Sequence, residues 1–209
     1  AVILAAGGTA RKLSIPGECE SFGKGVSYCA TCDGFFFRGK TVTVIGGGDT
    51  ALEDALYLSK ICTQVYLVHR REEFRGSRIL QQRVFAEPRI TTVLSSVATE
   101  ILSNDAGVTG VKVKNVQTGD MREIKTDGVF IFVGFSPNNQ LVPAGVKMNA
   151  GGYVITDEKC ETSLPGIFAV GDLRQKYANQ IVLAAADGCV AALAAAHYVE
   201  ARKAQTGKK

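Results

Sequence analysis

Two cysteines with two residues between them carry the clearest chemistry in this chain. Cys29-Ala30-Thr31-Cys32 is a C-x-x-C motif, a spacing that lowers the pKa of one thiol and so favours the reactive thiolate. Asp33 follows directly, and a carboxylate beside a dithiol can carry the proton that thiol–disulfide exchange requires. The motif therefore predicts a redox-active pair, with two buried structural thiols as the alternative.

A glycine-rich turn begins fourteen residues after Cys32. It follows the apolar run Thr41–Ile45 and precedes Asp49–Lys60, whose apolar residues recur with helical spacing. A G-x-G-x-x-A turn between a strand and a helix cradles a pyrophosphate, because its small residues let backbone amides approach the phosphates. We therefore expect a dinucleotide site here, with an ordinary glycine turn as the alternative. Its expected contacts are Gly46, Gly48, Asp49, Thr50 and Ala51.

Basic residues follow the second strand of this β-α-β unit. Gln64–Val68 leads into His69-Arg70-Arg71, and Arg75 lies one helical turn further on. An NAD site usually has Asp or Glu at this strand end, whereas guanidinium groups bind a 2′-phosphate through paired hydrogen bonds. The cluster predicts NADPH rather than NADH, with a solvated basic loop as the alternative.

Composition limits the class of protein. The 209 residues are 46% hydrophobic, enough for one large or two small domains. The net charge of +4 comes from short basic groups, which predicts no nucleic-acid surface, and no apolar run approaches the roughly 20 residues of a membrane span. The six cysteines include one motif spacing, and His69 and His197 lie far apart in sequence. We therefore expect a cytoplasmic redox protein without a metal site.

The remaining elements indicate two domains. Residues 90–125 predict an antiparallel meander, and the apolar run Val129–Val133 predicts a buried central strand. Ile167–Val170 is typical of a second buried strand, and Ile181–Glu200 of a helix. We expect boundaries near residues 13 and 127, so that the central segment forms one domain and the two flanks together form another.

A hydride donor and a disulfide acceptor need a mediator, and flavin is the usual one. Gly171-Asp172, at the end of the strand Ile167–Val170, is a candidate flavin contact. A short acid at a strand end can accept a hydrogen bond from a ribityl hydroxyl, or it can cap a helix. The residues alone favour the capping role.

The order of these motifs resembles the bacterial-type, low-molecular-weight thioredoxin reductase family. The matching stretches follow the family's order over nearly all 209 residues, and Cys-Ala-Thr-Cys-Asp separates this family from relatives of the same fold. The stretches are Ile15–Glu18, Cys29–Phe36, Gly46–Ala51, His69–Arg75 and Gly166–Asp172. The resemblance implies an α/β fold, in which a three-layer (ββα-type) NADPH-binding domain at 14–127 is inserted into a Rossmann-like FAD domain of the same type. Residues 1–13 and 128–209 would be parts of that FAD domain.

The resemblance also implies an activity and a partner. The family members are homodimeric flavoproteins that pass electrons from NADPH through FAD and a cysteine pair to thioredoxin. By position, Cys32 matches the cysteine nearest the flavin, and Cys29 matches the one that attacks the thioredoxin disulfide. Asp33 matches the acid–base residue.

Cofactor contacts carry over in the same way. Arg70, Arg71 and Arg75 match the 2′-phosphate contacts of the family. The segment Asp172–Ile181 matches the C-terminal flavin-binding segment, in which Gln180 and Ile181 reach the end of the flavin ring.

Two departures from the family bear on activity. The N-terminal G-x-G-x-x-G for the FAD pyrophosphate has no match here, and Asn179 stands where many members have a basic residue. Ala1–Gly8 is typical of a buried strand that ends at a glycine turn, so we expect the chain to be the C-terminal two thirds of a longer protein. Taken alone, it should bind FAD weakly or not at all. The alternatives to a thioredoxin reductase are a non-catalytic NADPH-binding fragment and a reductase of another dithiol acceptor.

Overall fold

Five parallel strands form the centre of the unit that spans residues 10–134. In sheet order they are β3 (Val26–Ser27), β10 (Gly128–Phe132), β4 (Thr41–Gly46), β5 (Gln64–Val68) and β6 (Ile90–Val93). Their middle members are rich in β-branched residues and largely buried, as expected of a parallel sheet that is covered on both faces. The computed structural model describes residues 1–207 of the chain.

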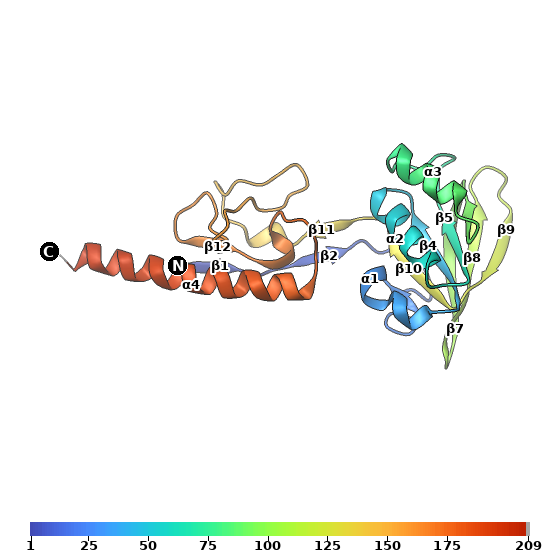
Figure 1. The fold of residues 1–209 in the computed structure, drawn as a ribbon, viewed down its shortest axis with the longest axis horizontal. Coiled ribbons are helices and arrows are strands. Elements are labelled where there is room, and N and C mark those ends of the chain that lie inside the picture. The colour runs from blue at the N-terminus through green and yellow to red at the C-terminus, as the bar shows by residue number, and fades with distance from the viewer. Residues whose placement is uncertain (208–209) are drawn as a thin grey trace. The chain divides into compact units, whose positions relative to one another are not determined.

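Helices cover one face of this sheet, and a second sheet covers the other (Figure 1). The helices are α1 (Ala30–Asp33), α2 (Asp49–Ser59) and α3 (Arg78–Ala86), with a 3-10 turn, η1 (Gly34–Phe37), after α1. The second sheet is an antiparallel meander of β7 (Ser96–Asn104), β8 (Gly107–Asn115) and β9 (Met121–Lys125).

Side-chain alternation along β4 joins the three layers. Val42 and Val44 belong to the buried cluster that includes Leu52 of α2, whereas Ile45 belongs to the cluster that includes Val111 of β8. Successive residues of a strand point to opposite faces, so one strand supplies both cores. This three-layer arrangement of sheet, sheet and helices confirms the predicted ββα fold.

The other unit, residues 1–9 with 135–209, contains short strands and one long helix (Figure 1). β1 (Val2–Leu4) pairs in parallel with β12 (Ile167–Ala169), and β2 (Gly8–Ala10) pairs with β11 (Phe135–Pro137). Two 3-10 turns, η2 (Asn139–Leu141) and η3 (Gly171–Leu173), precede the helix α4 (Ile181–Thr206). Phe168 of β12 lies in a buried cluster with Ala191 and Ala195 of α4.

The unit boundaries differ from those expected near residues 13 and 127. They fall after residues 9 and 134. The second shift follows from strand pairing, because Gly128–Phe132 lies in parallel register with Val42–Gly46 of β4. The run Val129–Val133 is thus a buried central strand, as predicted, but it belongs to the inserted unit.

The first strand is more exposed than the sequence predicted. Val2 is 55% exposed and Ile3 is 39% exposed. Within the described residues β1 has one strand neighbour, β12, which leaves its other edge and much of its surface uncovered.

The helix α4 corrects the expectation that no segment is apolar enough to span a membrane. An 18-residue window of this 26-residue helix has a mean hydropathy of 1.6, which meets the requirement by length and composition, and 6% of that window is buried within the described residues. Asp187 lies in the same helix and forms ion pairs with Arg174 and Lys176. These ion pairs tie that part of the helix to residues of the same unit.

Candidate functional site

One edge of the parallel sheet gathers the three motifs of the inserted unit. Because β3, β4 and β5 are parallel, the segments that follow them leave the sheet at the same edge. The cysteine pair follows β3, the glycine turn follows β4 and the basic cluster follows β5. Ligands of open α/β sheets bind outside this carboxyl edge.

Cys29 and Cys32 form a disulfide at the start of α1. Cys29 caps the helix, and its Sγ accepts a hydrogen bond from the Cys32 N–H at 3.2 Å. In the reduced pair the same N–H would stabilise a thiolate on Cys29, and the thiolate is the nucleophile in disulfide exchange. The geometry therefore favours Cys29 as the attacking sulfur and Cys32 as its partner.

Asp33 is half-buried in the first turn of the same helix. Its Oδ2 accepts a hydrogen bond of 2.6 Å from the hydroxyl of Ser27, the last residue of β3. Ser27 also accepts the Cys29 N–H at 3.0 Å. No motif in the sequence indicates Ser27; the one signal is its position two residues before the motif, at the end of a strand.

Close packing fixes the glycine turn between β4 and α2. A Cβ on Gly46 would lie 2.6 Å from the carbonyl oxygen of Phe132 and 2.6 Å from the Cβ of Ala51. Ala51 itself is fully buried, which fits its predicted role as a small residue between helix and strand. The space around Gly48 is open, because nothing lies within 4 Å of a Cβ built there.

That open space lies at the N-terminus of α2, where Gly48 is the N-cap. The first amides of a helix, here those of Asp49 and Thr50, have no acceptor within the helix and suit a phosphate. The side chain of Asp49 has another task, because its Oδ1 accepts the Ser77 N–H at 2.6 Å. The backbone N–H of Asp49 is thus free of the side chain's task and can bind a phosphate, while its carboxylate fixes the loop before α3.

Arg70, Arg71 and Arg75 line a pocket of about 480 Å³ beyond the end of β5. Ser95 and the turn between β8 and β9 also line this pocket, and the Gln117 amide of that turn donates a hydrogen bond to Glu72. Three exposed guanidinium groups around one pocket suit a phosphate, because each offers several donors in a planar arrangement.

His69 lies beneath the glycine turn and is buried. Its ring occupies the place that a Cβ on Gly47 would need, and its Nε2 has no hydrogen-bond partner among the described residues. Burial lowers the pKa of His69, and the positive charges of Arg75, Arg71 and Arg70 lower it further, so the ring is neutral at pH 7. Its ring packs between the turn and β5, a role that the sequence did not predict.

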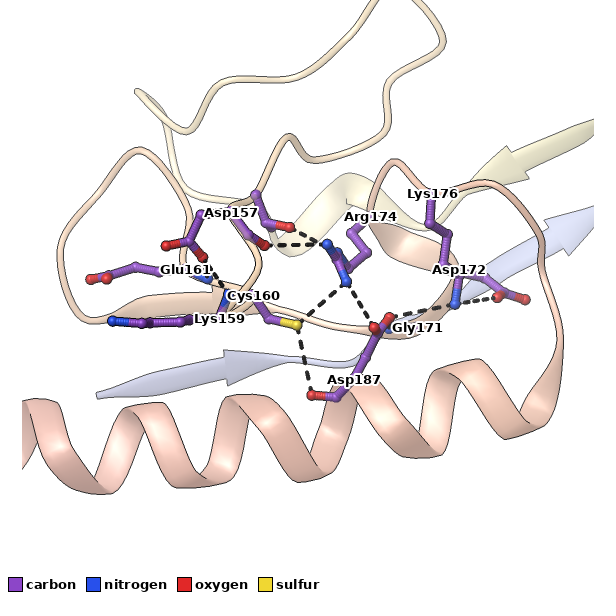
Figure 2. Close-up of polar contacts among 10 residues, drawn as sticks. Asp157, Lys159, Cys160, Glu161, Gly171, Asp172, Arg174, Lys176 and Asp187 are labelled. Carbon is purple, nitrogen blue, oxygen red and sulfur yellow. Dashed lines mark hydrogen bonds and ion pairs between the residues drawn. The ribbon is translucent and has the colours of Figure 1, made fainter.

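In the other unit, Gly171 and Asp172 begin η3, after β12 (Figure 2). Gly171 has φ +65°, a conformation that favours glycine, and its N–H donates to Asp187 Oδ2 at 3.1 Å. Asp172 Oδ1 is buried and forms an ion pair with Lys176 Nζ at 3.4 Å, and it has no hydrogen-bond partner among the described residues. This acceptor remains available to a hydroxyl of a ligand.

Asp187 connects this turn to two cations (Figure 2). Arg174 Nη1 donates to Asp187 Oδ1 at 2.7 Å, and Lys176 Nζ lies 3.5 Å from Oδ2. The same Arg174 nitrogen contacts Cys160 Sγ at 3.4 Å, and burial raises the pKa of that thiol. These side chains are mostly buried, and they fix the turn. The sequence did not indicate them, because each is a single polar residue whose partners lie elsewhere in the chain.

Gln180 and Ile181 begin the helix α4. Gln180 is its N-cap, and Ile181 is 88% exposed. Ala184, on the first turn of the same helix, lies 3.4 Å from a Cβ built on Gly171. The structure therefore brings the start of α4 against the Gly171 turn, as a shared binding segment requires.

Comparisons with known proteins agree with this arrangement. The family model of pyridine nucleotide-disulphide oxidoreductases matches residues 1–188. The chain is 44% identical to the thioredoxin reductase of Bacillus subtilis, over 96% of this chain and 63% of that protein, and 45% identical to that of Treponema pallidum, over 95% and 64%. It superposes on the crystal structure of thioredoxin reductase from Streptococcus pyogenes with a TM-score of 0.91 at 44% identity, covering 96% of this chain and 65% of that one.

The chain thus spans just under two thirds of the length of these relatives. The identities confirm the resemblance that the motifs indicated, and the aligned segments cover 95–96% of this chain. This chain belongs to the pyridine nucleotide-disulphide oxidoreductase family.

Proposed function

We propose that this protein is an NADPH-dependent flavoprotein disulfide reductase, which passes electrons from NADPH through FAD and the Cys29–Cys32 pair to oxidised thioredoxin. One observation carries the proposal: a disulfide, an open glycine turn and an arginine-lined pocket follow three adjacent or near-adjacent strands at one sheet edge. The relatives named thioredoxin reductase support thioredoxin as the acceptor.

Residues 10–134 form the NADPH-binding domain in this proposal. The open cradle at Gly48 fits the pyrophosphate, since a side chain at that position would fill it. Arg70, Arg71 and Arg75 hold the 2′-phosphate in their pocket. His69 supports this site from below as a neutral, buried ring.

Residues 1–9 and 135–209 contribute to a FAD domain. When bound, FAD supplies the step from a two-electron hydride donor to a disulfide. The buried Asp172 Oδ1, which lacks a hydrogen-bond donor among the described residues, fits a ribityl hydroxyl. The glycine turn at Gly171 and the helix start at Gln180 and Ile181 complete the proposed contacts.

The cysteine pair performs the exchange with the acceptor. The Cys29 thiolate attacks one sulfur of the acceptor disulfide, and the displaced sulfur leaves as a thiolate that takes up a proton. Cys32 then gives its proton to Asp33 and attacks Cys29 Sγ in the mixed disulfide. The internal disulfide forms again as the second acceptor sulfur leaves. That sulfur takes up the proton from Asp33. Two electrons and two protons have then moved to the acceptor.

A Cys29→Ser variant of the full-length protein tests this proposal. We expect thioredoxin reduction to be lost while NADPH still binds, because the nucleotide turn and pocket are intact. The exposed free cysteine Cys19 supplies the matched control, and Cys19→Ser should keep native turnover. Full thioredoxin turnover in Cys29→Ser would overturn the proposed role of the pair.

A non-catalytic NADPH-binding fragment is the second candidate for the chain alone. It is favoured by the two-stranded pairing of β1 and β12, which leaves Val2 and Ile3 exposed. Visible absorption of the purified chain separates the two candidates, because bound flavin colours a protein and the nicotinamide cofactor alone does not. A panel of thioredoxin-like proteins and small dithiol acceptors, assayed at equal concentration, would identify the acceptor.

The same proposal includes a homodimer in the cytoplasm that binds neither nucleic acid nor membranes. Reduced, exchange-active cysteines are typical of that compartment, and the charges of the chain form short groups. Light scattering of the full-length protein tests the dimer, and sedimentation with liposomes tests whether α4 binds lipid.

A further inference from the structure

Ser27 lies between the two groups that handle protons and electrons in the cysteine motif. It is 2% exposed and is the last residue of β3. Its Oγ accepts the Cys29 N–H at 3.0 Å and donates to Asp33 Oδ2 at 2.6 Å. One hydroxyl thus ties the strand end, the N-cap cysteine and the carboxylate together.

The hydroxyl proton has two acceptors within reach. Asp33 Oδ2 is 2.6 Å away and the carbonyl oxygen of Cys29 is 3.3 Å away. The carboxylate is charged and nearer, so it takes the proton, since hydrogen bonds to ionised acceptors are shorter and stronger. Ser27 therefore orients the Asp33 carboxylate in the first turn of α1, where the cysteine pair also lies.

We infer that Ser27 is a positioning residue for proton transfer in disulfide exchange and that it acts through Asp33. The inference rests on the proposed acid–base role of Asp33. Ser27 engages one carboxylate oxygen, and the other exchanges the proton of Cys32 as the disulfide forms. Without the hydroxyl, the carboxylate rotates more freely and spends less time in the position for transfer.

The test is a double-mutant cycle on the reduced chain. The measured quantity is the rate at which Cys29 and Cys32 form their disulfide. Hydroxyethyl disulfide is the oxidant: the pair forms its disulfide, and each oxidant molecule becomes two thiols. Samples are quenched with acid and alkylated, and mass spectrometry of the peptide containing both cysteines gives the rate. This readout needs neither FAD nor NADPH.

We expect Asp33→Asn to slow oxidation by about a hundredfold, at the lower end of general acid–base contributions, and Ser27→Ala by about tenfold. The double variant S27A/D33N should be no slower than D33N, because Ser27 acts through a group that is already lost. Ser27→Thr, which keeps the hydroxyl, should restore most of the rate.

Ser21 supplies the matched control. It is a serine of the same segment, 1% exposed, whose Oγ has no hydrogen-bond partner among the described residues. Ser21→Ala should oxidise at the native rate. If Ser27→Ala is too unstable to study, Ser27→Thr and Ser27→Val form a pair of equal shape that differs only in the hydroxyl.

The outcomes separate this inference from the proposed function. The inference is overturned if Ser27→Ala oxidises at the native rate while Asp33→Asn is slow, and the role of Asp33 then stands. If the alanine variant does not fold, Ser27→Val takes its place in this comparison. If the double variant oxidises more slowly than D33N by the same factor by which S27A is slower than the native chain, Ser27 acts independently of Asp33. That result also overturns the inference. A native rate in Asp33→Asn overturns both.

Discussion

Arg71 is a single residue at which cofactor choice can be measured. It lies exposed in the pocket that also contains Arg70 and Arg75. A hydrogen bond to a charged group contributes about 1.5–3 kcal/mol, and about 1.4 kcal/mol corresponds to tenfold in affinity. We expect Arg71→Gln to weaken NADPH binding about tenfold or more and to change NADH binding little.

Fluorescence titration of both nucleotides measures this effect. Arg78 of α3 is exposed and does not line the pocket, so Arg78→Gln is the control for the loss of one positive charge. An equal loss of NADPH and NADH affinity in Arg71→Gln would show that Arg71 contacts something other than the 2′-phosphate.

At the scale of elements, the carboxylate of Asp54 in α2 is partly buried, and burial disfavours its charged form. Burial raises the pKa of Asp54 to about 6, and the neighbouring Glu53 contributes. The folded state therefore binds this proton more tightly than the unfolded state does. The corresponding stability is present below the ordinary pKa of about 3.9 and is lost as the pH rises through about 6.

We expect Asp54→Asn to raise the melting temperature at pH 8 and to leave it nearly unchanged at pH 4, because the amide is neutral at both values. Thermal unfolding followed by circular dichroism at the two pH values measures the difference. Glu53→Gln, at an exposed position of the same helix, should produce a smaller change. Equal stabilisation at both pH values would point to a cause other than ionisation.

The helix α4 is held to its unit by Asp187, which accepts hydrogen bonds from the Gly171 N–H and from Arg174. Removing one partner of a mostly buried ion pair leaves the other charge without compensation, at a cost of about 3 kcal/mol. We expect Asp187→Ala to destabilise this unit by about that amount, measured by hydrogen exchange of the Val170 amide, whose acceptor is the backbone carbonyl oxygen of Leu4. Glu200→Ala, at an exposed position of α4, should have no such effect, and unchanged protection in Asp187→Ala would contradict this role.

Elements with local signals were predicted closely. β5 matches the predicted range, and β4 and α2 match to within one residue, because apolar periodicity and a glycine turn define them within a short window. The run Val129–Val133 was recognised as a strand but given to the wrong unit, since its partner β4 lies more than eighty residues earlier. Strand pairing between distant segments is not encoded in local periodicity.

The same limit applies to the site. Cys29, Cys32 and Asp33 form one contiguous motif, and the structure gives each a position that fits the predicted chemistry. Ser27 and Asp187 are single polar residues whose partners lie in other elements, so no spacing rule indicated them. His69 was expected to belong to the cofactor-binding cluster with Arg70 and Arg71, and its burial beneath Gly47 depends on packing that the sequence does not display.

At the scale of the whole molecule, the two units differ in how well the described residues cover their strands. The central sheet of residues 10–134 is covered on both faces, whereas β1 of the other unit has one strand neighbour and exposed side chains. Large apolar residues of α4 are also exposed, among them Ile181, Val182 and Leu193. The proposed nucleotide site therefore lies on a well-covered sheet, and the proposed flavin contacts lie in a partly covered unit.

This difference predicts that the 209-residue chain binds its two cofactors unequally. NADPH should bind, because the turn at Gly48 and the arginine pocket lie wholly within residues 10–134. FAD should bind at much less than one per chain, because its proposed contacts at Gly171, Asp172, Gln180 and Ile181 all lie in the partly covered unit. Isothermal titration with each cofactor, together with the visible spectrum, measures both. Tight, stoichiometric FAD binding by this chain would show that residues 1–9 and 135–209 are sufficient for the flavin site, and the fragment hypothesis would then be wrong.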